Sequence, residues 1–101
     1  MVTTIIWNKT ALTTFNDIAA YLNENFSNTA ARNFVEAAYD KIEQLEKHPT
    51  IGRKVPKTKS LRMINFGKHH QMYYRVQGKT LFICDFFDMR QHPDKKPYSK
   101  R

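Results

Sequence analysis

The stretch HHQMYYRVQGKTLFICDFFDMRQHP, residues 69–93, decides the fold of this chain. It holds two runs rich in aromatic and aliphatic residues, His69–Val76 and Thr80–Phe87, and the Gln77-Gly78 pair between them is a hairpin-turn signal. Strands joined by so short a turn pair in the antiparallel sense. The stretch therefore predicts a β-hairpin.

The same stretch places polar residues at or near the strand ends: Arg75, Arg90, Gln91 and His92. Guanidinium groups bind phosphate through paired hydrogen bonds, and histidine exchanges protons near neutral pH. A patch of cations, a histidine and aromatic rings could bind a phosphate backbone or an acidic protein. The structural alternatives are an Arg75–Asp85 pair across the hairpin and a local turn formed by Asp88 and Arg90.

Upstream of the hairpin, apolar residues recur at helical spacing in two segments. The first stripe comprises Ala11, Leu12, Phe15, Ile18, Ala19 and Leu22, and the second comprises Ala31, Phe34, Val35, Ala38, Ile42 and Leu45. Asn8 can cap the first helix, Ser27 or Asn28 can cap the second, and Pro49 ends the second. The short connection between them predicts an antiparallel helical hairpin.

Two further strands complete the expected fold. Thr3–Trp7 precedes the first helix, and Leu61–Phe66 precedes a tight turn at Gly67-Lys68. The segment Thr50–Ser60 is predicted to be a basic loop without apolar periodicity. The order β-α-α-β-β-β predicts an α+β fold in which the helical hairpin packs on one face of a small, mainly antiparallel sheet. One domain would span residues 1–93, followed by a basic polar tail at residues 94–101.

The length and charge of the chain limit the functional classes to which this protein can belong. A chain of 101 residues builds one domain with a modest core. The formal net charge is +8, with four Lys/Arg and six Asp/Glu in residues 1–50 (−2) but thirteen and three in residues 51–101 (+10). This asymmetry favours a polyanionic partner for the second half, and a solubilising basic surface is the alternative.

The cysteine content argues against a disulfide-stabilised protein, and the hydropathy argues against a membrane-spanning one. Cys84 is the only cysteine, so no disulfide forms within the chain, and its apolar neighbours predict a buried, inert thiol. No cluster of His, Cys and Asp has metal-ligand spacing, and we expect neither a metal nor another cofactor. The N-terminus lacks signal-peptide features, and no apolar run approaches the roughly 20 residues that span a bilayer. We expect a cytoplasmic protein without a membrane partner.

Four segments together resemble the RelE/ParE superfamily of type II toxin–antitoxin toxins: IIWNKTALTTFNDIAAYL (5–22), AARNFVEAAYDKIEQLEKHPTIGRKVP (30–56), HHQMYYRV (69–76) and FFDMRQHP (86–93). The ordered set covers almost the whole chain and is more specific than any one segment. The resemblance implies a small cytoplasmic toxin that arrests growth and is made beside a cognate antitoxin. RelE-like members cut mRNA in the ribosomal A site, whereas ParE-like members poison DNA gyrase and are not enzymes.

RNA cleavage by 2′-OH attack requires a base, charge stabilisation and an acid. RelE-like nucleases take cleft residues from the later strands and the C-terminal end, which implies Arg90, His92 and Arg75 as candidate catalytic residues. Candidate residues for binding RNA or another target are Arg53, Lys54, Lys57, Lys59, Arg62, His70, Gln71, Gln91 and Tyr98. One position departs from the family pattern, since Gln71 stands where RelE-like enzymes usually have arginine. Arg75 would face the same side of a regular strand as Gln71.

Three functional hypotheses follow. A ribosome-dependent mRNA endonuclease is preferred because of the basic second half and its Arg/His group. Gln71 and the ParE-like character of YYRV and DMRQHP favour the alternative, a gyrase inhibitor without enzymatic activity. The third hypothesis is an inactive module that only binds antitoxin. All three predict an acidic, partly disordered antitoxin segment along the helical hairpin and sheet, anchored by exposed Phe26, Tyr39 and Phe66.

Overall fold

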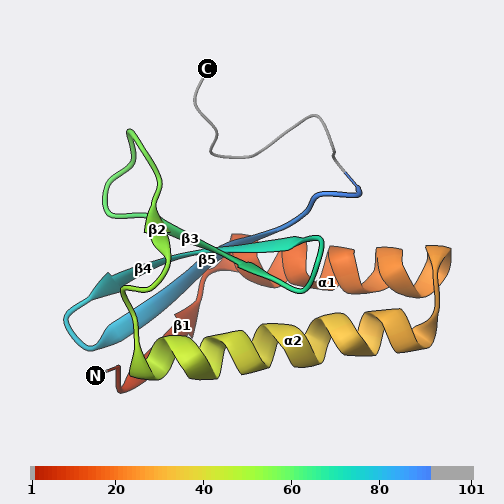
Figure 1. Ribbon diagram of the computed structural model, residues 1–101, viewed down its shortest axis with the longest axis horizontal. Coiled ribbons are helices and arrows are strands. Elements are labelled where there is room, and N and C mark those ends of the chain that lie inside the picture. Colours follow the sequence, from red (N-terminus) through yellow and green to blue (C-terminus); the bar gives the residue numbers. More distant parts are fainter. Residues whose placement is uncertain (1, 92–101) are drawn as a thin grey trace.

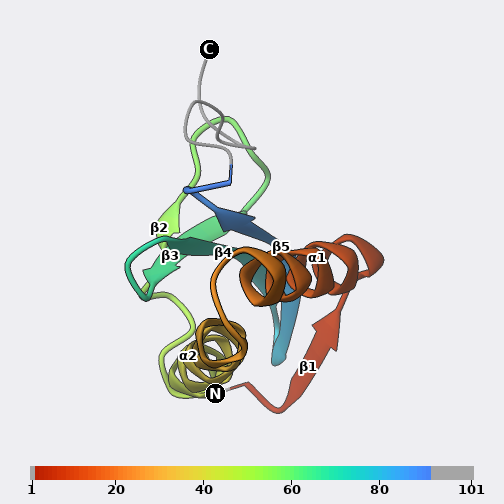
Figure 2. The same ribbon diagram turned by 90° about the vertical axis from the view of Figure 1, so that its right-hand side faces the viewer.

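The computed structural model describes residues 2–91. Its elements are, in order, β1 (Thr4–Trp7), α1 (Lys9–Asn25), α2 (Asn28–Lys47), β2 (Arg53–Lys54), β3 (Arg62–Phe66), β4 (His70–Gln77) and β5 (Thr80–Asp88). The five-stranded sheet has the order β1-β5-β4-β3-β2, in which β1 is parallel to β5 and the other pairs are antiparallel. The helical hairpin covers one face of this sheet (Figure 1, Figure 2). The predicted α+β fold is confirmed.

The segment predicted to be a loop, Thr50–Ser60, contains one further strand. Its β2 pairs with β3 and forms an edge of the sheet. Val55, which follows β2, is buried with 9% of its surface exposed. The prediction of a loop without strand structure was wrong, because a strand of two residues has no periodicity and depends on a partner that only folding supplies.

Both helices begin at a side-chain cap and bury one stripe. Asn8 Oδ1 accepts a hydrogen bond from the Ala11 N–H at 2.8 Å, and Ser27 Oγ accepts from the Ala30 N–H at 3.0 Å. The buried residues are Ala11, Phe15, Ile18 and Leu22 in α1, and Phe34, Ala38, Ile42 and Leu45 in α2. Only Phe26 and Ser27 connect the helices, so they run antiparallel and their apolar stripes meet the sheet together.

A β-bulge in the long β4–β5 pair changes the facing of β5. Tyr73 lies opposite Asp85, but Tyr74 lies opposite Ile83, so Cys84 is an extra residue in β5. Tyr74 and Ile83 pack in the core beneath the helices, whereas Tyr73 and Cys84 pack on the other side of the sheet. Asp85 shares that other face because cross-strand partners point to the same side.

The sheet therefore buries residues on both faces. The larger core lies under the helices, where Trp7 packs 5.1 Å from Phe15 and 5.4 Å from Phe86 between ring centroids. On the opposite face, a smaller group that we term the outer cluster comprises Val55, Leu61, Met63, Tyr73, Cys84 and Phe87. Burial raises the pKa of the Cys84 thiol, which fits the predicted inert cysteine.

Candidate functional site

A group of polar side chains meets an aromatic ring where β5 ends. We term it the strand-end cluster, and it comprises Phe26, His70, Asp88, Arg90 and Gln91. Asp88 lies at its centre with only 1% of its surface exposed. Its Oδ2 lies 3.1 Å from His70 Nε2, and its Oδ1 accepts hydrogen bonds from the N–H groups of Arg90 (2.8 Å) and Gln91 (3.3 Å). The predicted turn at Asp88 and Arg90 is confirmed.

His70 belongs to the interior rather than to an open binding surface. It is 7% exposed, and its ring centroid lies 4.6 Å from that of Phe34 and 5.5 Å from that of Phe66. Burial lowers the pKa of His70 below its ordinary 6.5, although the Asp88 carboxylate acts in the opposite direction. A neutral ring that donates from Nε2 satisfies Asp88. Packing and this contact occupy His70 in the structure described, and its role in binding a target stays a prediction.

Phe66 shares this buried position. It is 4% exposed and its ring stacks on Phe34 at 5.9 Å. The expectation that Phe66 is an exposed antitoxin anchor is wrong, because the alternation of β3 turns it toward α2. The other two predicted anchors are exposed, Phe26 at 53% and Tyr39 at 54%.

Arg90 extends from the turn toward the tip of the helical hairpin. Its guanidinium carbon lies 4.4 Å from the centroid of the Phe26 ring. Its Nε is 3.9 Å from Asp88 Oδ1, which is an ion-pair distance without a hydrogen bond. A predicted catalytic residue and a predicted antitoxin anchor are thus in direct contact, although they lie in distant parts of the sequence.

Arg75, the second predicted catalytic arginine, lies well away from the strand-end cluster. It is opposite Phe82 and lies five residue steps along β4 from His70, about 17 Å along a strand. The register places Asp85 opposite Tyr73, so Arg75 and Asp85 are diagonal neighbours on the same face of the sheet, and their pairing stays a prediction. The two predicted catalytic arginines therefore occupy different regions.

Gln71 and Arg75 share the face of the outer cluster, as predicted from their even spacing. Gln71 is 4% exposed, and its Oε1 accepts a hydrogen bond from the Tyr73 hydroxyl at 3.0 Å. Gln71 is thus buried beside the outer cluster, and its role in binding a target stays a prediction.

Arg62 holds the connection between α2 and β2. Its Nη1 donates to the carbonyl oxygens of Thr50 (3.1 Å) and Gly52 (2.7 Å). The Tyr74 hydroxyl donates to the Pro49 carbonyl at 2.8 Å and accepts from the Gly52 N–H at 2.9 Å. Arg62 was predicted to bind a target, but these contacts assign its guanidinium a structural role.

The remaining cations between β2 and β3 are exposed. We term residues 53–60 the basic loop; its exposed cations are Arg53, Lys54, Lys57 and Lys59. The base of the loop is closed by the buried Val55 and Leu61, with a hydrogen bond from Val55 N–H to Leu61 O of 2.9 Å. The loop projects from the sheet on the side away from the helices (Figure 1, Figure 2). These four predicted target-binding residues are accessible together.

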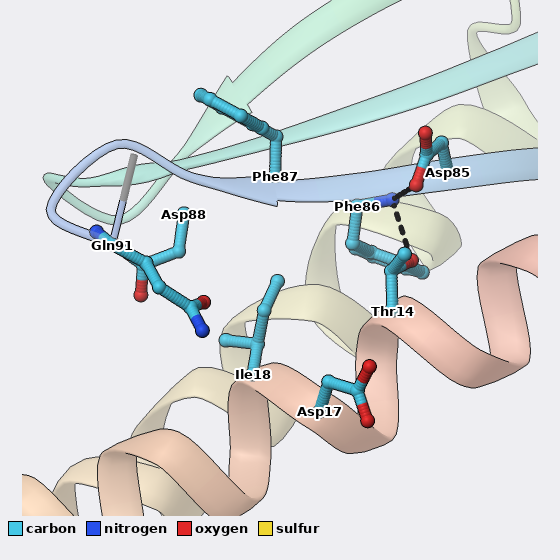
Figure 3. A pocket seen from close by; sticks show the side chains of 8 residues that line it. All are labelled: Thr14, Asp17, Ile18, Asp85, Phe86, Phe87, Asp88 and Gln91. Atoms are coloured by element: carbon cyan, nitrogen blue, oxygen red, sulfur yellow. Dashed lines mark hydrogen bonds between the residues drawn. The ribbon is translucent and has the colours of Figure 1, made fainter. Parts of the chain in front are cut away.

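Sequence reasoning missed an acidic pocket of about 230 Å³ between α1 and β5. It is lined by Thr14, Asp17, Ile18, Asp85, Phe86, Phe87, Asp88 and Gln91 (Figure 3). The Phe86 N–H donates to Thr14 Oγ1 (3.1 Å) and to Asp85 Oδ1 (2.8 Å) at its wall. Asp17 has the pattern of an ordinary solvent-facing helix residue, so no local signal could have found the pocket.

Some predicted features lie outside the described residues, namely His92, Tyr98 and the tail at 94–101. Within residues 2–91, no group of three or more His, Cys, Asp or Glu side chains is arranged to hold a metal ion. No helix in this range has the length and hydropathy needed to cross a membrane.

Known proteins resemble this chain in sequence pattern and in fold. A family model described as the ParE toxin of the type II toxin-antitoxin system parDE matches residues 5–93. A chain of the chromosomal ParDE toxin–antitoxin system from P. aeruginosa superposes with a TM-score of 0.72 at 16% identity, covering 86% of this chain and 96% of that one. A conserved hypothetical protein from Helicobacter pylori gives a TM-score of 0.54 at 11% identity, covering 89% and 97%. No curated protein matches the sequence.

The helical hairpin on a mostly antiparallel sheet, together with these matches, defines a toxin of the RelE/ParE superfamily. The family model spans nearly the whole chain, and the chain belongs to the ParE toxin family of type II toxin–antitoxin systems. Membership implies an antitoxin protein as its partner.

Proposed function

We propose that this ParE-type toxin arrests growth by binding DNA gyrase and not by cleaving mRNA. The observation that carries the proposal is the separation of the predicted catalytic groups. Arg75 and the strand-end cluster are about 17 Å apart along β4, and His70 is buried against Asp88. A cleavage site would need a base, an acid and a cation around one phosphate. Within residues 2–91, which do not include the predicted catalytic His92, the side chains are not grouped in this way, and this supports a protein that acts through contacts.

The basic loop supports a contact mechanism. Arg53, Lys54, Lys57 and Lys59 are exposed within seven consecutive positions, on a loop whose base is closed by buried side chains. Such a cluster attracts a polyanion or an acidic protein surface, and gyrase engaged with DNA offers both. We assign these four residues to target binding, with Arg90 and Gln91 as a second contact region.

The deciding experiment gives the purified toxin two substrates in parallel. One reaction contains gyrase, plasmid DNA and ATP, and the other contains translating ribosomes with a defined mRNA. We expect gyrase–DNA cleavage complexes to accumulate and supercoiling to fall, while the mRNA stays intact. Cleaved A-site mRNA with normal supercoiling at excess toxin would establish the nuclease and overturn the proposal.

Charge-matched variants identify the contact surface. The double variant Lys57→Glu/Lys59→Glu should reduce gyrase inhibition about tenfold or more, with a weaker salt dependence. The double variant Lys9→Glu/Lys47→Glu changes the net charge equally at exposed positions outside the basic loop, and it should inhibit as the wild type does. Equal losses in both variants would indicate a general charge effect.

The antitoxin is proposed to cover the helical hairpin. Phe26 and Tyr39 are exposed aromatic residues on this hairpin and offer apolar contacts, whereas an acidic segment would be attracted to residues 51–101, which carry +10 against −2 in residues 1–50. An inactive module that only binds antitoxin remains the competing function. Growth arrest on expression without antitoxin would eliminate it.

A further inference from the structure

We infer that Phe26 is a positioning residue, which holds the Arg90 guanidinium in the orientation that contacts the target. This inference rests on the proposed role of Arg90 in target binding, but not on the identity of the target. It assigns to the tip of the helical hairpin a part in toxicity as well as in antitoxin recognition.

The first observation concerns what holds Arg90. Asp88 fixes the Arg90 main chain through a 2.8 Å hydrogen bond, but its carboxylate is 3.9 Å from Nε. Both Asp88 oxygens already accept hydrogen bonds, Oδ2 from His70 and Oδ1 from the turn N–H groups. The face of the guanidinium is contacted by the Phe26 ring, whose centroid lies 4.4 Å from the guanidinium carbon. Asp88 therefore fixes the backbone of the turn, whereas the Phe26 ring contacts the Arg90 side chain and sets its direction.

The second observation concerns Phe26 itself. The N–H groups of Phe26 and Ser27 both donate to Leu22 O, at 2.9 and 3.0 Å, and Ser27 also caps α2. This two-residue connection has little freedom, so it presents the ring from a fixed backbone. The side chain is 53% exposed, with Tyr21 edge-on at 6.0 Å. A large aromatic ring at such a position contributes little to the core.

The chemistry of the pair explains why an aromatic ring suits this position. A guanidinium stacks on an aromatic face through its own face, which leaves the N–H groups at its edge free to donate. A flexible arginine on a turn would otherwise lose rotamer freedom when it binds a target. Stacking on Phe26 reduces that loss before the target arrives.

A substitution series in two backgrounds tests the inference. Phe26→Tyr, Phe26→Trp and Phe26→Leu are made with Arg90 present and with Arg90→Gln, and free-toxin growth arrest is measured at matched protein levels. We expect Tyr and Trp to retain activity, and Leu to weaken it about 2- to 5-fold, the size of an exposed cation–π contact. Leu should have no further effect in the Arg90→Gln background.

The control is Leu12→Ala, which truncates another exposed apolar residue of the hairpin (49%) and should leave growth arrest unchanged. Equal toxicity of Phe26→Leu and the wild type, or the same loss in both Arg90 backgrounds, would overturn the inference.

A spectroscopic readout tests the contact without any activity. In ¹⁵N-labelled protein, the Arg90 Hε resonance should be shifted upfield by the ring of Phe26, Tyr or Trp, and should return toward its ordinary position in Phe26→Leu. An unmoved resonance would contradict the contact. The target question stays separate, because aromatic-dependent growth arrest without gyrase inhibition would refute the gyrase proposal and leave the inference standing.

Discussion

The strand-end cluster and the basic loop both hold charged residues, but most of those in the cluster are buried and those in the loop are exposed. In the strand-end cluster, Asp88 is buried and accepts three hydrogen bonds, and His70 is enclosed by aromatic rings. In the basic loop, four cations are exposed. In the strand-end cluster only Arg90 keeps a partly exposed charge, whereas all four cations of the basic loop are exposed. The difference predicts large stability effects in one region and mainly binding effects in the other.

The largest effect is expected for Asp88→Ala. This change leaves His70 Nε2 and two turn N–H groups without their acceptor in a buried site, and should cost about 3 kcal/mol in the free energy of unfolding. Urea denaturation measures it. The control Asp17→Ala removes an exposed carboxylate of the neighbouring pocket and should change stability by less than about 0.5 kcal/mol. Similar losses of unfolding free energy in Asp88→Ala and Asp17→Ala would contradict the expected difference between a buried and an exposed carboxylate.

Gly52→Ala should rank second, because it disturbs the base from which the basic loop extends. A Cβ at this position would lie 2.5 Å from the Tyr74 hydroxyl and 3.0 Å from the Met63 carbonyl oxygen. We expect a loss of about 2 kcal/mol. Gly78→Ala adds a Cβ in open space at φ +58° and should cost about 1 kcal/mol from backbone strain alone. Thermal unfolding shows which of the two variants is less stable. A larger loss for Gly78→Ala than for Gly52→Ala would contradict the close contact between Gly52 and the Tyr74 hydroxyl.

The pH dependence tests the buried state of His70. Because burial lowers its pKa in the folded protein, the unfolded chain binds the proton first as pH falls. The stabilisation is therefore complete above about pH 6.5 and declines toward the lower folded pKa, with a slope of at most about 1.4 kcal/mol per pH unit. His70→Phe should lose this component of the pH profile. A steeper decline in the variant would mean that His70 is charged in the folded state.

The smallest stability effect is expected in the basic loop. Lys57→Gln/Lys59→Gln removes two exposed charges and should change the free energy of unfolding by less than about 0.5 kcal/mol. Target binding should nevertheless weaken, and its salt dependence should become shallower. Denaturation measures the effect on stability, and gyrase titration of the same preparation measures the effect on target binding. A loss of stability comparable to that of Asp88→Ala would remove the distinction between the regions.

Much of the fold was predictable because its signals act over a few residues. Asn8 and Ser27 cap the helices as their residue types suggest, and the apolar stripes contain all the buried helix positions, although Leu12 of the first stripe is 49% exposed. The predicted turn signal at Gln77-Gly78 and the alternation around it locate the central hairpin, although the observed turn is Gly78-Lys79, because Gln77 still pairs with Thr80. The two-residue β2 was missed because pairing with β3, and not its own sequence, makes it a strand.

The candidate site was predicted less well, for a different reason. Arg62, His70 and Gln71 have the residue types of a binding site, but each is hydrogen-bonded within the fold; the partners of Arg62 and His70 come from other segments, and that of Gln71 is Tyr73 in the same strand. The Arg90–Phe26 contact joins the end of the sheet to the tip of the hairpin, which no spacing in the sequence encodes.

The sequence by itself determined the element order, the antiparallel helical hairpin, the basic second half and the family resemblance. These depend on local periodicity, capping and composition, which are properties of neighbouring residues. Only the tertiary structure decided which cations are exposed, that Phe66 is buried and that Arg75 and Arg90 lie apart. Those outcomes depend on strand register, a β-bulge and long-range packing, and each joins residues that the sequence keeps far from one another.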